Sequence, residues 1–193
     1  MKKLFLTALA VIAFGFANAQ ESKAYLGVSV GVAFPGGVVA DDLGLKTGLN
    51  IGFINFGYRF SESWGATLNL ISSGYSIENT DAAIGVATFS VGPMYTAKLG
   101  EKMSLDLKPQ YALSMVGKTK GLSDIDDVTY KGNGLVLGSS LNFGITKGFK
   151  FSINLDYTAG KFKEAEYAGD TVSIDSDNKF NSLALGAGLR YNF

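Results

Sequence analysis

The sequence contains no cysteine and no histidine, and it has only three prolines and one tryptophan. The lack of cysteine excludes a disulfide framework and thiolate chemistry. Without histidine, activation of a nucleophile would fall to Lys, Asp or Tyr, and no such constellation stands out, so we expect no enzyme activity, cofactor or metal centre. Basic and acidic residues are balanced at 17 each, which gives no basic surplus to attract nucleic acid.

Long apolar runs are also missing, except for one at the N-terminus. Lys2 and Lys3 precede an apolar run over residues 4–17, and Ala17-Asn18-Ala19 forms a small-x-small cleavage site. The run is shorter than the ~20 residues that a membrane-spanning helix needs. The pattern therefore predicts a cleavable signal peptide over residues 1–19 and one mature domain over residues 20–193. We expect export from the cytoplasm, and entry into any membrane as strands.

What is present is alternation of apolar and polar residues. In KFSINLDYTAG (150–160), one face carries Phe151, Ile153 and Leu155, and the other carries polar residues and Asp156. Such segments are longer than the five or six residues common in soluble sheets, and long enough for the ~9–11 residues of a spanning strand. Glycine, at 25 residues, recurs inside them, which favours strong curvature. The predicted strands cover 24–34, 46–60, 64–77, 84–98, 103–116, 131–145, 149–160 and 179–193.

The connections between these strands alternate in length. Tight turns follow the second, fourth and sixth strands (61–63, 99–102 and 146–148). Longer connections follow the first, third, fifth and seventh (35–45, 78–83, 117–130 and 161–178). An up-and-down barrel places all the tight turns at one end and all the long loops at the other. The predicted fold is therefore all-β: an eight-stranded antiparallel up-and-down transmembrane β-barrel.

The last strand adds a more specific pattern, because Leu189, Tyr191 and Phe193 occupy alternate positions up to the final residue. With the signal peptide, the eight amphipathic strands and the alternating loops, the chain resembles the small eight-stranded outer-membrane barrels of Gram-negative bacteria, the outer-membrane protein X-like and outer-membrane protein A-like group. The resemblance implies that these three residues are the signal read by the outer-membrane assembly machinery, after periplasmic chaperones have carried the chain. It also implies a monomer in outer-membrane lipid, with both termini in the periplasm.

Alternation alone does not say which face is outward. A soluble lipocalin-like carrier would bury the apolar face, whereas a membrane barrel would expose it to lipid. The low charged fraction, 18%, and a nearly charge-free face in strands four to eight favour lipid. Aromatic residues near the tight-turn end are then predicted to form a belt at the headgroup level: Tyr58, Phe60, Trp64, Tyr95, Phe143 and Phe151. A second belt at the other end would contain Phe34, Tyr75, Phe162, Tyr167 and Phe180.

The opposite, polar face predicts the contents of the lumen. Eight strands leave room only for side chains, and buried charges require partners. We therefore expect a network in which Asp106 and Asp156 neutralise several cations. Its predicted members are Arg59, Lys98, Asp106, Lys108, Asp156 and Arg190. Two apolar residues that share the polar face of the second strand, Ile51 and Phe53, are expected to pack inside near one rim.

Two prolines make a separate structural prediction. Pro93 and Pro109 would face each other across the fourth and fifth strands, and neither can donate a ladder hydrogen bond. A local break or bulge is expected there.

These patterns favour a small integral outer-membrane protein with a side-chain-filled lumen. Its role would be structural, in the cell envelope, or in surface interaction through the long loops, with loop 161–178 as the expected contact for a surface ligand. Two alternatives stay open: a narrow ion-conducting, porin-like pore lined by Arg59, Asp106, Lys108, Asp156 and Arg190, and a soluble secreted lipocalin-like carrier.

Overall fold

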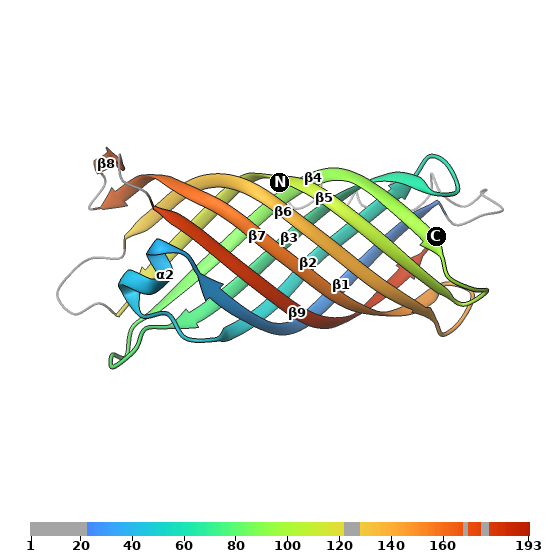
Figure 1. Cartoon of the computed structure of the whole chain (residues 1–193), viewed down its shortest axis with the longest axis horizontal. Helices are drawn as coiled ribbons and strands as arrows, with labels where there is room; N and C mark the ends of the chain where they lie inside the picture. Colours follow the sequence, from blue (N-terminus) through green and yellow to red (C-terminus); the bar gives the residue numbers. More distant parts are fainter. Residues whose placement is uncertain (1–22, 122–127, 168–169, 175–177) are drawn as a thin grey trace, which may run out of the picture.

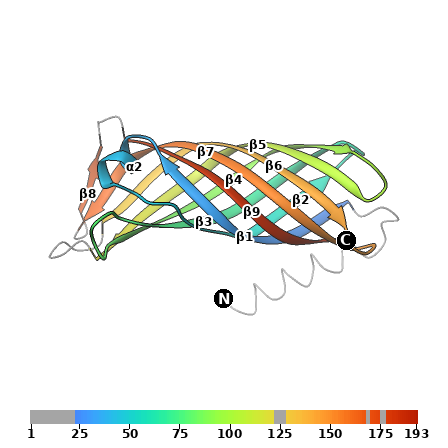
Figure 2. The ribbon, with the colours of Figure 1, turned by 60° about the horizontal axis from the view of Figure 1, so that its bottom comes forward.

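The computed structural model describes residues 23–121, 128–167, 170–174 and 178–193. The predicted signal peptide over residues 1–19 lies outside these. In the described part, strands wind around one axis as a closed, tilted cylinder (Figures 1 and 2). No helix in these ranges is long and apolar enough to cross a membrane.

Eight long strands close the cylinder. Each pairs antiparallel with its neighbours in the order β6-β5-β4-β3-β2-β1-β9-β7, and β6 pairs with β7 to complete the ring. A ninth strand, β8, pairs only with the outer part of β7. The eight-stranded antiparallel prediction is therefore confirmed. The strands are β1 (Ala24–Gly36), β2 (Gly48–Arg59), β3 (Trp64–Ser76), β4 (Ala83–Lys98), β5 (Met103–Lys120), β6 (Thr129–Gly144), β7 (Phe149–Tyr167), β8 (Asp170–Ser173) and β9 (Lys179–Asn192).

The two ends of the barrel differ as the loop lengths predict. The turns after β2, β4 and β6 gather at one end, called here the short-turn end (right in Figure 1). The opposite, long-loop end carries α2 (Val38–Leu43) and β8. Here parts of the predicted loops form regular structure, because β7 continues to Tyr167 and pairs antiparallel with β8. The expectation of a loop over 161–178 is therefore wrong for 161–167 and 170–173.

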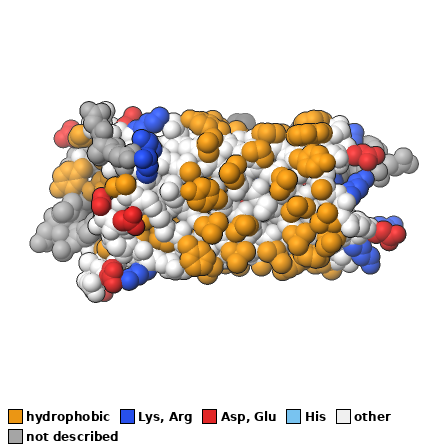
Figure 3. Space-filling view, in the orientation of Figure 1, with side chains coloured by type: hydrophobic (Ala, Val, Ile, Leu, Met, Phe, Trp, Pro, Cys, Tyr) orange, Lys and Arg blue, Asp and Glu red, His pale blue; other side chains and the backbone are white. Residues whose placement is uncertain are grey.

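The wall of the barrel is apolar outside. Leu135 and Leu137 on the outer face are 59% and 60% exposed, whereas Asp106 and Lys108 on the inner face are at most 1% exposed. Figure 3 shows hydrophobic side chains over the middle of the wall and charges gathered toward the ends. This polarity is the reverse of that of a soluble lipid carrier and the one expected of a barrel in lipid.

A bulge in β2 corrects the expectation for Ile51 and Phe53. The pairing of β2 with β3 shifts between Gly52 and Ile54, so two consecutive residues, Phe53 and Ile54, both face outward. Phe53 is 52% exposed, and the half-buried Ile51 lines the same apolar hollow of the outer wall as Phe53. One extra residue inverts the alternation at that point, and the apparent misfit between Phe53 and Arg59 disappears.

The long-loop half of the lumen is filled by apolar side chains. Tyr75, Phe162 and Phe180 lie inside the barrel at 1–2% exposure, in a cluster with Ile84, Met115 and other residues. Tyr75 and Phe180 pack edge to face at 5.9 Å. The second aromatic belt is therefore wrong for these three residues, because near that end the inward strand positions carry aromatic instead of polar side chains.

The helix α2 extends this packing over the barrel end. It lies against β1 and β9, with Ala40 buried and Val39 and Leu43 against the apolar cluster.

The predicted proline break is confirmed. The β4–β5 ladder runs to Val91 opposite Tyr111 and resumes at Tyr95 opposite Leu107. Pro93 and Pro109 occupy the gap, while each stays in register with its other neighbour strand.

Candidate functional site

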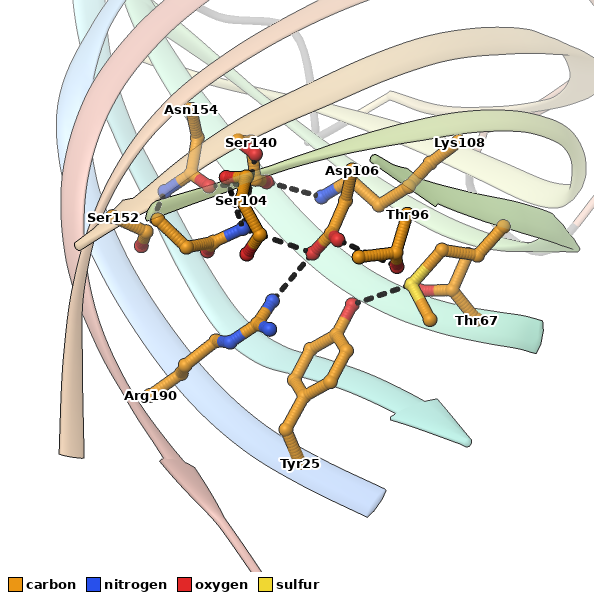
Figure 4. Close-up of polar contacts among 12 residues, drawn as sticks. Tyr25, Thr67, Thr96, Ser104, Asp106, Lys108, Ser140, Ser152, Asn154 and Arg190 are labelled. Carbon is orange, nitrogen blue, oxygen red and sulfur yellow. Dashed lines mark hydrogen bonds and ion pairs between the residues drawn. The ribbon is translucent and has the colours of Figure 1, made fainter. Parts of the chain in front are cut away.

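The centre of the polar lumen is Asp106, on the inward face of β5. Its side chain is completely buried, yet both carboxylate oxygens have partners (Figure 4). Thr96 donates to Oδ1 at 2.8 Å, and the amide of Asn142 donates to Oδ2 at 3.1 Å. The Arg190 guanidinium forms an ion pair with Oδ2. Side chains from β4, β6 and β9 thus contact one carboxylate on β5. These contacts neutralise its charge and satisfy its hydrogen-bonding capacity.

Arg190 reaches this carboxylate across the lumen along the ring of Tyr25. Its guanidinium carbon lies 4.0 Å from the ring centroid, in a cation–π contact. The Tyr25 hydroxyl donates to the sulfur of Met94 at 3.3 Å. Gly57 makes room for the ring, because a Cβ there would come within 2.2 Å of it. A pairing between residues 84 positions apart is therefore held by an aromatic platform.

A second group of polar contacts surrounds Lys108. Its ammonium donates to the Ser140 hydroxyl at 2.8 Å, and that hydroxyl donates to the side-chain amide oxygen of Asn154 at 2.6 Å. Asp156 lies beside Lys108 across Gly138, where a Cβ would come 2.5 Å from the Asp156 Oδ1 and 3.3 Å from the Lys108 Cε. Within the part of the chain that the structure describes, that Oδ1 accepts no hydrogen bond. Asp156 therefore does not act as the expected multiple acceptor for the cations.

Asp156 also borders a small internal cavity of about 20 Å³. Serine and threonine side chains line it as well, including Ser73, Thr88, Thr158 and Ser182. The volume corresponds to about one water molecule, which would give the carboxylate a partner.

Two predicted network members lie elsewhere. Arg59 and Lys98 line an open hollow at the short-turn end, which we call the basic vestibule. Lys98 is 61% exposed and pairs with Glu62 at 3.5 Å, outside the buried network. The network residues that sequence reasoning missed are Tyr25, Thr96, Ser140, Asn142 and Asn154. All five fall on inward-facing positions. Which of them lie near Asp106 and which near Lys108 depends on the stagger between strands, and alternation does not reveal that stagger.

The six belt residues lie near the short-turn end, and five of them are at least 37% exposed. Phe143 is half-buried and packs against Phe151, with ring centroids 6.4 Å apart. Trp64 and Tyr95 meet edge to face at 5.1 Å. Of the proposed assembly signal, Leu189 and Tyr191 are exposed on the outer wall at 52% and 47%.

This aromatic surface continues across β7 and β9. Tyr191 packs on Phe149 at 4.9 Å and stacks on Phe193 at 6.1 Å.

At the long-loop end, the charges form exposed pairs. Lys131 on β6 binds Glu166 on β7 at 2.7 Å. The hydrogen bond and the attraction of Lys131 lower the pKa of Glu166, and the same contact raises the pKa of Lys131. Lys46 and Glu78 form a second pair at 2.8 Å. Within the described ranges, no group of three or more acidic side chains is arranged to hold a metal ion.

Comparison with known proteins agrees with this geometry. The family model for the "Outer membrane protein beta-barrel domain" matches residues 4–193. Neisserial surface protein A superposes with a TM-score of 0.59 at 14% identity, over 88% of this chain and 97% of that protein. No curated protein sequence matches the chain.

Two Pseudomonas aeruginosa structures are similar as well. The N-terminal β-barrel domain of OprF has a TM-score of 0.51 at 12% identity, over 90% of this chain and 100% of that domain. The outer-membrane protein OprG has a TM-score of 0.51 at 13% identity, over 90% and 97%. The chain belongs to the outer-membrane β-barrel domain family and is a protein of the bacterial outer membrane.

Proposed function

We propose that this outer-membrane barrel is a rigid, non-conducting anchor that presents its long-loop end for interaction at the cell surface. The observation that carries the proposal is the packing of the lumen along its length. Toward the short-turn end, Asp106, Arg190 and Lys108 fill it at 4% exposure or less. Toward the long-loop end, Phe162 and Phe180 fill it at 2% or less. Packing of this kind supports a plugged barrel over the alternative of an ion-conducting pore.

The extension formed by the outer ends of β6 and β7 together with β8 is the strongest candidate for the interacting surface. Residues 164–167 of β7 pair with β8, beyond the last residue of β7 that pairs with β9, Lys161. All four residues of β8 are exposed, and Val172 is 61% exposed. The Lys131–Glu166 pair joins β6 to this extension. An exposed extension on a rigid wall is where recognition by loops is expected.

The proposal includes no catalytic step, because the chain has neither histidine nor cysteine to act as base or nucleophile. Envelope integrity is the wider role in which such an anchor would serve.

A loop-trimming experiment tests the proposal. One variant lacks residues 166–173, and a matched control lacks the same number of residues from the 121–128 connection. Both are expressed in cells deleted for the protein, and heat-dependent gel mobility verifies assembly. We expect the wild type and the control to restore adhesion and detergent resistance, and the first variant to assemble but to restore neither. Full restoration by the first variant would overturn the proposal.

A further inference from the structure

The basic vestibule is a hollow of about 680 Å³ at the short-turn end, and the buried network does not use it. All three short turns contribute to its wall, together with Lys23, the first described residue, and the ends of β2, β4, β6, β7 and β9. Phe60 and Ile145, at 65% and 60% exposure, stand at its rim. The hollow is thus an open cup beside the aromatic belt, at the level expected for lipid headgroups.

The charge of this cup is one-sided. Six cationic side chains line it, against the two acidic side chains Glu62 and Glu101. The cations are Lys23, Arg59, Lys98, Lys102, Lys147 and Lys150. Over the chain as a whole the two signs are equal, so the excess is local. Cations brought together in a concave wall attract anions more strongly than the same charges spread over a convex surface.

The inner end of the cup is closed, and its wall carries a side-chain oxygen that is open to a hydrogen-bond donor. Lys150, half-buried in the wall, lies in register with Arg190, which is already bound to Asp106. An anion entering from the short-turn end would therefore stop at this level. Asn192 also lines the cup, and although it is only 6% exposed, its side-chain oxygen has no hydrogen-bond partner among the described residues.

We propose that the basic vestibule binds a phosphate-bearing anion. Several lysines would contact the anionic oxygens, and the Asn192 oxygen would accept a hydrogen bond where the ligand also carries a hydroxyl. A phosphate group supplies the charge density that ammonium groups bind well. The ligand has two sources at this surface: a soluble polyphosphate, and the headgroup of an anionic phospholipid.

The first test is calorimetric titration of tripolyphosphate into the full mature protein, inserted in nanodiscs of phosphatidylcholine alone. We expect saturable binding of one ligand per barrel that weakens as salt is raised. The K102Q/K147Q variant should lose about tenfold in affinity for each lysine removed, since each contact is a hydrogen bond between charged groups. These lysines lie in the turns, away from the buried network, and heat-dependent mobility verifies that the variant is folded.

A matched control removes two lysines from the other end, as K120Q/K163Q. It should bind tripolyphosphate as the wild type does. Loss of affinity equal to that of K102Q/K147Q would show that only the overall charge matters and would overturn the proposal. Absence of saturable binding to the inserted wild-type protein would overturn it as well.

Nanodiscs that contain phosphatidylglycerol distinguish the two sources of phosphate. The negative surface of these discs weakens tripolyphosphate binding to the wild type and to K102Q/K147Q alike. If the lipid headgroup occupies the vestibule, the wild type loses more affinity than K102Q/K147Q does. If the ligand is soluble, the two proteins lose affinity by the same factor. Either result supports a phosphate site, because both require the wild type to bind and the turn variant to fail.

Discussion

Replacing Asp106 with asparagine tests the energetic centre of the lumen. The change keeps the size of the side chain but removes the charge that binds Arg190 and receives hydrogen bonds from Thr96 and Asn142. The Arg190 charge then stays buried at 4% exposure without its counter-ion. Breaking a buried pair in this way costs about 3–5 kcal/mol. We expect Asp106→Asn to lower the free energy of unfolding by that amount.

The double variant Asp106→Asn/Arg190→Met is the control. It removes both charges and leaves an apolar side chain on the Tyr25 ring, so its loss should be smaller than that of Asp106→Asn alone, about 1–2 kcal/mol. Urea unfolding in lipid vesicles measures both, because Trp64, the only tryptophan, is 53% exposed on the outer wall and reports on its transfer from lipid. A loss below about 0.5 kcal/mol for Asp106→Asn would refute the reasoning.

Three further predictions concern the lumen, the wall and the loops. Gly138→Ala brings a Cβ to 2.5 Å from the Asp156 Oδ1 and should lower the free energy of unfolding by about 1–3 kcal/mol. A Cβ at Gly74 would have no described atom within 4 Å, so Gly74→Ala should change the free energy of unfolding by less than about 0.5 kcal/mol. Urea unfolding midpoints of the two variants test this difference. Leu137→Arg places a charge on the lipid-facing wall and should lower the free energy of unfolding by about 2–4 kcal/mol. The ratio of folded to unfolded protein on heat-dependent gels measures this loss. A stability equal to that of the wild type would mean that this face does not contact lipid. The contact with Lys131 lowers the pKa of Glu166 in the folded protein. The stabilisation from this ion pair is therefore fully present above the ordinary Glu pKa of about 4.3, and it is lost as the pH falls through the lower pKa of the folded state. Amide exchange at the outer ends of β6 and β7, corrected for the intrinsic rate, should therefore rise on acidification, and Lys131→Gln should remove that step.

The architecture follows from the sequence because a closed barrel repeats one simple rule. Alternation assigns each residue to one face, and loop lengths assign each turn to one end. The same rule failed at Phe53, where one extra residue in β2 inverts the alternation. It failed again at Phe162 and Phe180, because an inward position can hold an aromatic ring where apolar neighbours surround it.

The buried network was less accessible to sequence reasoning for a different reason. Charge and alternation placed Asp106 and Arg190 on the inner face, but their pairing depends on the stagger of β5 against β9 across the lumen. Nothing in the residue pattern indicates that Lys98 pairs with Glu62 in the vestibule whereas Lys108 is buried. Depth along the strand separates these two lysines, and the strand ends that define depth are the least certain part of a prediction from sequence.

Electrical recording from the refolded protein in a planar bilayer, with insertion verified, tests the account most directly. The packed lumen predicts silence, both in the wild type and in K102Q/K147Q, whose changes lie in the open vestibule. Steady openings whose conductance shifts in Asp106→Asn would contradict it, because they would mean that ions pass the level at which Asp106 and Arg190 meet.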